Sequence, residues 1–240
     1  MIPALSSAAH GIQTGIRRLD RAANDVANAS TVGYRGDQRG APGPVMSTGS
    51  PLDLAIQGDG WFRVAQSDGT AIGEVRYTRA GDFHQDGQGF VVASDGRYLL
   101  GTPLAPGGQP AGPEGRIRLP ATATSVAVGG DGTVSATLAD GSTQAVASVS
   151  LARFSNPAGL EAVGDGQYRA TVNSGAPQVG APGTGGLGEL AGGALEGSNV
   201  DLAETTVQQV LARNEVAANV RSMAAADELL KELARVDARA

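Results

Sequence analysis

Apolar side chains recur at a spacing of seven residues along the first part of the chain. The repeat is formed by Leu5, Ile12, Leu19 and Val26. Small residues, Ala8, Gly15 and Ala22, stand between them, and charged residues lie off the stripe. This spacing is typical of a helix with one narrow apolar stripe, as in the seam of a coiled coil. The pattern predicts a helix of about 39 Å within residues 1–33, and its stripe needs a partner to be buried.

A polar run follows this helix over residues 28–35. Gly33 is well placed to end the helix, because glycine adopts the left-handed conformation without a steric cost. Asn24 and Asn28 stand four residues apart, so they share one helix face. Together with Thr31 they form either the capping side chains of a fraying end or a polar patch that fixes the register of packed helices. The residues alone favour neither interpretation.

The hydrophobic pattern changes after a short connector over residues 34–51. Short apolar runs follow at residues 61–64, 90–92, 125–128, 133–138 and 146–151. Asp-Gly pairs separate many of these runs; they begin at Asp59, Asp68, Asp86, Asp95, Asp131, Asp140 and Asp165. An Asp-Gly pair between β-forming residues favours a hairpin turn, since both residues tolerate a positive φ. The pattern predicts an antiparallel β-rich domain over residues 52–172.

The C-terminal part begins with a stretch rich in glycine and proline, residues 173–197, which we expect to be a linker or an extended arm. Ser198 and Asn199 can cap a second long helix over residues 198–240. Its apolar stripe follows three- and four-residue steps through Val216, Val220, Met223, Ala226, Leu230 and Leu233. The fold class is therefore α+β, with a long helix at each end of an antiparallel β-rich central domain. The two stripes have no evident partner except each other or copies in neighbouring chains.

The composition of the chain excludes several classes of function but says little about the fold. The chain of 240 residues contains 36 glycines, 12 prolines and no cysteine, with a formal net charge of −6. The lack of cysteine excludes a disulfide scaffold, a thiolate metal site and a cysteine nucleophile. The acidic balance argues against binding to nucleic acid, and the lack of an apolar run of about 18 residues argues against direct membrane insertion. The N-terminus also lacks the basic start and apolar stretch of a cleavable signal peptide.

Few residues in the chain carry candidate chemistry. Gly183, Gly185 and Gly188 match a dinucleotide-binding spacing, but no strand–helix pattern surrounds them, so a linker is the expected role. His84 lies between two carboxylates, as one half of a general-base pair could, yet neither a nucleophile elbow nor a second nearby histidine accompanies it. The Asp-Gly pairs lack the ligand spacing of a calcium loop. We therefore expect no enzyme, no cofactor and no metal, while a pair of carboxylates brought together by folding stays open.

Five segments of the chain resemble the bacterial flagellar basal-body rod and hook proteins. They are residues 23–35, 52–62, 77–83, 193–202 and 226–230. The first is rich in asparagine and ends in the pattern Thr31-x-Gly33-Tyr34-Arg35, and the five follow the family's order over nearly the whole chain. Residues 154–160 and 174–177 look most like the distal-rod branch of the family. Two departures leave a proximal-rod or hook paralogue open: the short connector, and the run Arg213-Asn214-Glu215-Val216 in the last helix.

The resemblance implies a structural subunit of the flagellar rod that transmits torque as part of a rigid shaft. In this family the terminal helices pack as an inner coiled-coil layer, and the β-rich domains form the outer layer. The implied partners are copies of the chain in a helical polymer, neighbouring rod and hook subunits, the flagellar export apparatus and the surrounding ring proteins. The implied place is the basal body, reached by type III export across the inner membrane without a cleaved signal. A secreted β-rich enzyme or a carbohydrate-binding domain is the alternative from another class.

The resemblance and the two apolar stripes together mark the residues expected to pack between subunits. They are Leu5, Ile12, Leu19, Asn24, Val26, Asn28, Thr31, Gly33, Tyr34, Leu195, Ser198, Asn199, Val200, Val216, Asn219, Met223, Asp227, Leu230 and Leu233. Assembly would bury the stripes, and burial of apolar surface contributes about 25 cal/mol per Å². Helical polymers arise from contacts that do not close into rings.

Overall fold

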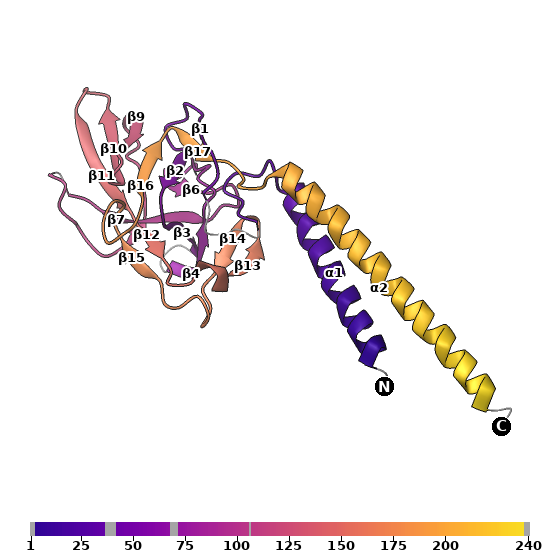
Figure 1. The fold of residues 1–240 in the computed structure, drawn as a ribbon. Helices are drawn as coiled ribbons and strands as arrows, with labels where there is room; N and C mark the ends of the chain where they lie inside the picture. The colour runs from indigo at the N-terminus through magenta and orange to yellow at the C-terminus, as the bar shows by residue number, and fades with distance from the viewer. Residues whose placement is uncertain (1–2, 37–41, 68–71, 106, 238–240) are drawn as a thin grey trace. The chain divides into compact units, whose positions relative to one another are not determined.

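The computed structural model describes residues 3–36, 42–67, 72–105 and 107–237. The chain divides into two compact units (Figure 1). Both ends of the chain, residues 1–29 and 200–240, make the helical unit, and residues 30–199 make the β unit. In sequence, an antiparallel β-rich domain lies between two terminal helices, and the predicted α+β class is confirmed.

The helical unit consists of α1 (Pro3–Ala27) and α2 (Leu202–Asp237), which lie side by side. Gly33 does not terminate α1, because the helix already ends at Ala27. Instead the side-chain amide of Asn28 closes the last turn, donating to the carbonyl oxygen of Asn24 at 2.9 Å and to its Oδ1 at 2.7 Å. Within the chain, the two asparagines therefore act as a capping pair.

The start of α2 also differs from the expectation. Asp201 caps this helix, since its Oδ1 accepts from the backbone N–H of Ala203 at 2.8 Å and of Glu204 at 3.2 Å. Asn199 is engaged elsewhere, because its Oδ1 accepts from the N–H of Gly36 at 3.0 Å. The prediction that Ser198 and Asn199 cap the helix was wrong, because only Asp201 stands two and three residues before the free amides.

Short antiparallel strands make up most of the β unit. Their bounds are β1 Val45–Ser47, β2 Leu54–Gln57, β3 Trp61–Ser67, β4 Ile72–Thr78, β5 His84–Gln85, β6 Val91–Val92, β7 Tyr98–Pro103, β8 Gly115–Arg116, β9 Ala123–Val128, β10 Thr133–Leu138, β11 Thr143–Val149, β12 Leu151–Arg153, β13 Glu161–Gly164, β14 Gln167–Arg169, β15 Gln178–Gly180, β16 Glu189–Gly192 and β17 Ala194–Glu196, with a 3₁₀ turn at Pro157–Gly159. The main sheet follows the order β13-β14-β4-β3-β7-β11-β10-β9, and β12 pairs with β3 beside it. Two smaller sheets, β1-β17 and β16-β2, complete the unit.

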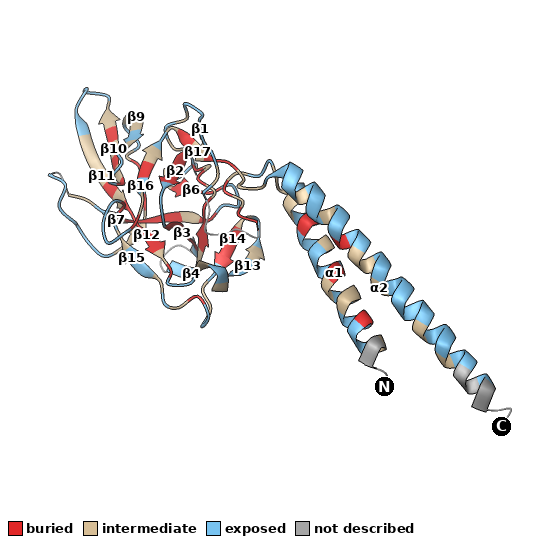
Figure 2. Cartoon of the chain, viewed as in Figure 1, coloured by how far each residue is buried: buried red, intermediate tan, exposed pale blue. Residues whose placement is uncertain are grey.

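The core of the β unit lies on both faces of β3. Because side chains alternate along a strand, Phe62 and Val64 enter a large aliphatic cluster, while Trp61 enters a second cluster rich in aromatic rings. In that second cluster the rings of Trp61 and Tyr168 meet edge to face with centroids 4.8 Å apart. Figure 2 shows buried residues on most of the central strands, so the β unit has a core of its own.

The segment over residues 173–197 is not a free arm. It contributes three strands to the body: β15 pairs with β12, β16 with β2, and β17 with β1. The connector also joins the fold, since β1 lies within it. Sequence periodicity missed these strands because each is only three or four residues long. Close backbone packing explains some of the glycine content: a Cβ on Gly188 would lie 2.4 Å from the carbonyl oxygen of Gln57.

Most of the Asp-Gly pairs form the turns that were predicted. The pairs that begin at Asp86, Asp95, Asp131, Asp140 and Asp165 join strands that pair with each other. At Asp165 and Gly166 both φ values are positive, 51° and 67°, as a two-residue hairpin turn requires. The pair Asp59-Gly60 is the exception, because it connects β2 to β3 and these strands belong to different sheets. The pair Asp68-Gly69 lies outside the described residues.

Candidate assembly surfaces

The two helices of the helical unit approach each other most closely at small residues. A Cβ on Gly15 would lie 2.4 Å from Cγ2 of Val216, and a Cβ on Gly11 would lie 2.4 Å from Nδ2 of Asn219. The rising numbers on α1 meet falling numbers on α2, so the helices are antiparallel. Ala212, on the facing side of α2, is buried. Glycine and alanine therefore set the distance between the helices, as small residues do wherever backbones approach closely.

The larger apolar residues of the predicted stripe are less buried than the small residues at this contact. Leu5, Ile12 and Leu19 are half-buried, and Val26 stays 40% exposed. The large residues of the stripe are thus less buried than the small residues Ala8, Gly15 and Ala22 that stand between them. The heptad describes the large side chains, whereas the closest packing occurs at the small residues between them.

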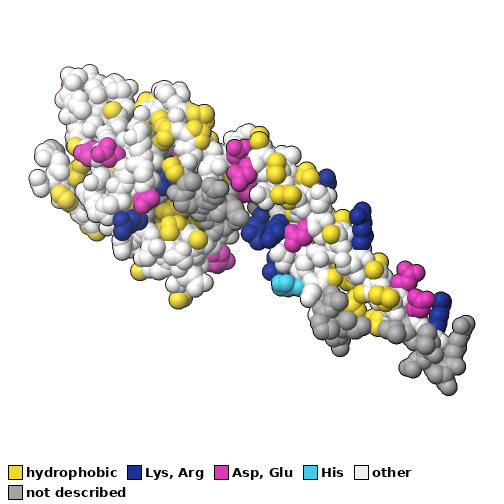
Figure 3. Space-filling view, viewed as in Figure 1, with side chains coloured by type: hydrophobic (Ala, Val, Ile, Leu, Met, Phe, Trp, Pro, Cys, Tyr) yellow, Lys and Arg dark blue, Asp and Glu magenta, His cyan; other side chains and the backbone are white. Residues whose placement is uncertain are grey.

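Many apolar side chains of the helical unit point away from the helix pair. Those with at least 40% exposure are Ile16, Val26, Leu202, Val207, Val210, Leu211, Val220, Met223 and Leu229. Successive residues of a helix are separated by about 100°, so Leu202, Val210 and Leu211 face three different directions. Figure 3 shows hydrophobic side chains spread along this unit. A helix that is apolar on several sides is typical of a buried position, and here α1 covers only one side of α2.

Two exposed ion pairs of the helical unit add little to its stability. Arg18 Nη1 and Glu215 Oε2 lie 2.7 Å apart, with more than a third of each side chain exposed. On α2, Lys231 pairs with Asp227 at 2.6 Å across one turn. Exposed ion pairs contribute about 0–1 kcal/mol. The apolar and small residues therefore define the helix pair.

A disulfide can test this packing, because the chain has no cysteine of its own. A Cβ on Gly15 would lie 3.7 Å from Cβ of Val216, and disulfides need about 3.8 Å between Cβ atoms. We expect the double variant Gly15→Cys/Val216→Cys to crosslink under mild oxidation, as read from peptide mass mapping of the monomer. Gln13→Cys/Val216→Cys is the control, since Gln13 is exposed on α1 and Gly15 stays unchanged. Equal crosslinking of the two pairs would contradict the packing described here.

The chain leaves the β unit toward the two helices along two adjacent segments, residues 33–36 and 196–199, which we call the exit segments. The N–H of Gly33 donates to the carbonyl oxygen of Glu196 at 2.7 Å, and the N–H of Asn199 donates to the carbonyl oxygen of Tyr34 at 3.3 Å. Gly33 has a φ of +64°, and a Cβ there would lie 2.2 Å from the backbone N of Ala80. Gly33 is therefore needed in the left-handed region, as predicted, but for a close backbone contact rather than for ending a helix.

A buried ionic cluster lies beneath the exit segments. Glu196 Oε1 accepts from Arg35 Nη2 at 2.7 Å and Nε at 3.1 Å, and Glu196 Oε2 accepts from Arg79 Nη1 at 3.0 Å. All three side chains are at least 96% buried. Burial lowers the pKa of Arg79 to about 10, against the opposing effect of the Glu196 carboxylate. Arg79 also donates to the carbonyl oxygens of Ile56 at 3.1 Å and Gly58 at 2.6 Å.

Aromatic side chains of the β unit lie against the ionic cluster. The Cζ atoms of Arg35 and Arg79 each lie 5.7 Å from the ring centroid of Trp61, which is within cation–π range. The hydroxyl of Tyr168 donates to the carbonyl oxygen of Arg35 at 3.2 Å. The roles of Arg79 and Glu196 were not predicted from the sequence. The available signal was that Arg79 lies in one family-like segment, residues 77–83, and Glu196 in another, residues 193–202.

The residues predicted to pack between subunits fall into three groups by burial. Gly33 is buried. The half-buried ones are Leu5, Ile12, Leu19, Asn28, Tyr34, Leu195, Ser198, Asn199, Val200, Val216, Asn219 and Leu230. The exposed ones are Asn24, Val26, Thr31, Met223 and Asp227. The side chain of Leu233 lies outside the described residues. Most of them lie in the two helices or the exit segments, and Asn28, Thr31, Leu195 and Val200 lie beside these parts.

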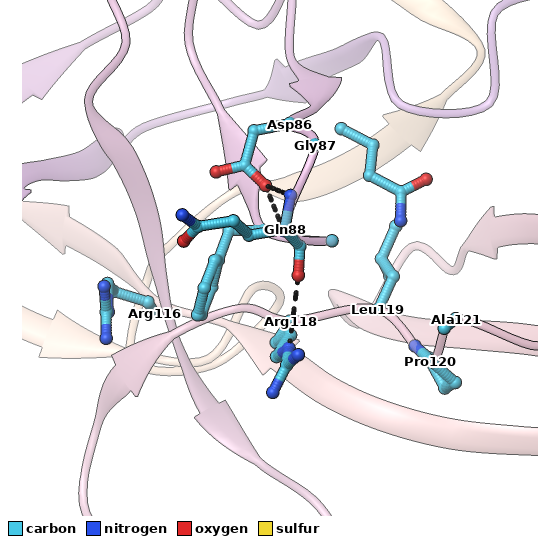
Figure 4. A pocket seen from close by; sticks show the side chains of 11 residues that line it. Asp86, Gly87, Gln88, Arg116, Arg118, Leu119, Pro120 and Ala121 are labelled. Atoms are coloured by element: carbon cyan, nitrogen blue, oxygen red, sulfur yellow. Dashed lines mark hydrogen bonds between the residues drawn. The ribbon is translucent and has the colours of Figure 1, made fainter. Parts of the chain in front are cut away.

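A separate cleft on the β unit lies between the turn at residues 85–90 and residues 116–121 (Figure 4). Arg116 lies over the ring of Phe90 with Cζ 4.5 Å from its centroid, and Arg118 Nε donates to the carbonyl oxygen of Gln88 at 3.3 Å. Asp86 Oδ1 accepts from the N–H groups of Gln88 and Phe90, so this carboxylate holds the turn. Among the described lining residues no second carboxylate accompanies Asp86, so this cleft lacks the pair that glycoside hydrolysis uses.

Comparison with known proteins identifies relatives over nearly the whole chain. Residues 55–136 match the model of the flagellar hook protein FlgE/F/G D1 domain, and residues 191–236 match that of the flagellar basal body rod FlgEFG protein C-terminal region. The flagellar basal-body rod protein FlgG of Bacillus subtilis is 33% identical over 97% of this chain and 98% of its own length. FlgG of Caulobacter vibrioides is 31% identical over 95% of this chain and 97% of its own.

Hook proteins match over shorter stretches. The flagellar hook protein FlgE of Escherichia coli is 36% identical over 48% of this chain and 28% of its own length. A crystal structure of the Helicobacter pylori hook protein FlgE2 matches 24% of this chain and 14% of its own at 29% identity, with a TM-score of 0.21. Within the described residues, neither helix is sufficiently long and apolar to cross a membrane.

Proposed function

The chain belongs to the flagellar basal-body rod and hook protein family, and from this premise we propose that it is a structural subunit of the bacterial flagellar rod. The observation that carries the proposal is the 33% identity to a basal-body rod protein over 97% of this chain and 98% of the relative. Similarity from end to end includes both terminal helices as well as the β unit. In this role the chain polymerises and transmits torque, and it catalyses no reaction.

The apolar surface of the helical unit supports polymerisation. Leu211 and Leu229 are 56% and 63% exposed on α2, and α1 covers another side of that helix. Neighbouring subunits would bury these side chains, with about 25 cal/mol gained per Å² of apolar surface. In the proposed rod, the terminal helices form a coiled-coil inner layer and the β units form the outer layer. The residues of the helix pair and the exit segments make the contacts between subunits.

The finer assignment is to the distal rod. The full-length similarity to two FlgG proteins supports it, since the hook protein of Escherichia coli matches only 48% of this chain. In this assignment the partners are copies of the chain, adjacent rod and hook subunits, the ring proteins around the shaft and the flagellar export apparatus. Export would proceed without a cleaved signal peptide.

Two substitutions on α1 test the role of the helices. Val26 is exposed in the single chain and Leu19 is half-buried, so Val26→Asp and Leu19→Asp should leave the β unit folded. We expect both to abolish rod polymerisation, because a carboxylate would be buried in the helical layer at a cost of several kcal/mol. The measurement is mass spectrometry and electron microscopy of purified hook–basal bodies from cells that carry each variant.

Gln13→Asp serves as the control, since Gln13 is an exposed polar residue on the same helix. A deletion strain should give particles that stop short of the hook. Absence of the chain from wild-type basal bodies, with normal swimming of the deletion strain, would refute the proposed function. Normal rods in both aspartate variants would refute the role of the α1 stripe alone.

A further inference from the structure

We infer that Glu196 is a positioning residue for assembly. Its buried carboxylate holds the two exit segments to each other, and we call this contact the lock. Because of the lock, the segments that lead to the two helices are already paired before the subunit joins the polymer. The role in assembly rests on the proposed function. The lock itself is a property of the single chain and can be tested without any polymer.

The carboxylate of Glu196 joins three parts of the chain that are distant in sequence. Oε1 accepts from Arg35 in the first exit segment and from the N–H of Gly43 at 3.0 Å, and Oε2 accepts from Arg79 at the end of β4. The backbone of Glu196 adds a further bond, since its carbonyl oxygen accepts from the N–H of Gly33 at 2.7 Å. One residue therefore holds the first exit segment, the connector and the main sheet together.

Around this residue, neighbouring contacts hold the same two segments. Gly36 donates to the side chain of Asn199, and Asn199 donates to the backbone of Tyr34. β17 ends at Glu196 and pairs with β1, with Val45 opposite Glu196. The bond between Gly36 and Asn199 joins residues that lie 163 positions apart. Both chain segments that lead to the helices thus leave the β unit as one hydrogen-bonded pair.

Charge explains why this position holds a glutamate and not an apolar residue. An apolar side chain could fill the space, but it would remove the carboxylate that accepts hydrogen bonds from both buried guanidinium groups. Buried ion pairs seldom add net stability compared with apolar packing, and their attested use is to specify one arrangement among several. Here the specified arrangement is which residues of the two exit segments face each other.

Amide hydrogen exchange in the full-length monomer tests the lock. In Glu196→Gln, the side-chain amide cannot accept from both arginines, so the exit segments should open more often. We expect exchange at the amides of Gly33, Gly36 and Gly43 to accelerate about tenfold or more, while the amides of β10 and β11 keep their protection. Glu189→Gln is the matched control, because Glu189 is exposed on β16 and should leave all these rates unchanged.

A second variant covers the case in which Glu196→Gln does not fold. Arg35→Lys keeps the charge but loses the two-nitrogen contact with Oε1, so a smaller acceleration at the same three amides is expected. Unchanged exchange at these amides in the folded variants would overturn the lock. Rod assembly should also fail in cells that carry Glu196→Gln. If exchange accelerates in this variant but rods form normally, the role of Glu196 in assembly is refuted and the proposed function is not affected. Absence of the wild-type chain from rods would instead refute the proposed function and not the lock.

Discussion

Gly33→Ala is expected to lower the free energy of unfolding of the β unit by about 3 kcal/mol. Two costs combine at this position. The residue has a φ of +64°, where any side chain is strained, and the new Cβ would lie 2.2 Å from the backbone N of Ala80 and 2.3 Å from the carbonyl carbon of Arg79. Backbone atoms cannot move aside as a flexible side chain can. The exit segment would have to separate from the end of β4.

Gly49→Ala separates the two costs. Gly49 has a φ of +78°, but no atom lies within 4 Å of the position of its Cβ. In this control the free energy of unfolding should fall only by the conformational cost of a side chain at positive φ, about 1 kcal/mol. Trp61, the single tryptophan, is buried beside the exit segments and reports on unfolding by its fluorescence during denaturation with urea. Equal losses in the two variants would show that the contact between Gly33 and Ala80 does not form.

Gly15→Leu is expected to separate the two terminal helices and to prevent rod formation. Even a single Cβ at this position meets Val216 Cγ2 at 2.4 Å, and a leucine adds three further carbon atoms. Helices in proteins gain most of their stability from packing of an apolar face, and α1 would lose its packed partner. The amides of α1 should therefore lose most of their protection from hydrogen exchange in the monomer, while those of the β unit keep theirs.

The matched control adds the same bulk on the outer side of the same helix. Ala9 is exposed, so Ala9→Leu should leave the exchange of the α1 amides unchanged. Electron microscopy of basal bodies then shows whether Gly15→Leu is incorporated. Full protection of α1 in Gly15→Leu would mean that the helices do not meet at glycine.

Elements with a repeated spacing of residues could be predicted from the sequence, whereas contacts between residues distant in the sequence could not. Spacings of seven and of three to four residues predicted both helices, short apolar runs predicted the β-rich domain, and Asp-Gly pairs marked five of the hairpins. The cluster of Arg35, Arg79 and Glu196 leaves no periodic trace, because its members come from three segments that only the fold brings together. The strands over residues 173–197 were missed because each is only three or four residues long and because the glycine-rich composition resembles a linker, although close backbone contact explains some of that glycine, as at Gly188.

The pairing of β16 with β2 and of β17 with β1 also sets an order of events for a newly made chain. β1 and β2 lie within the first quarter of the sequence, and their partners end only at Glu196. A chain that emerges with its N-terminus first, from a ribosome or from a narrow channel, cannot complete these sheets until most of its length has appeared. Contacts between distant residues also form slowly, because a large loop has to close first. β1 and β2 therefore stay unpaired until β16 and β17 have emerged. The β unit can complete its fold only when most of the chain is present.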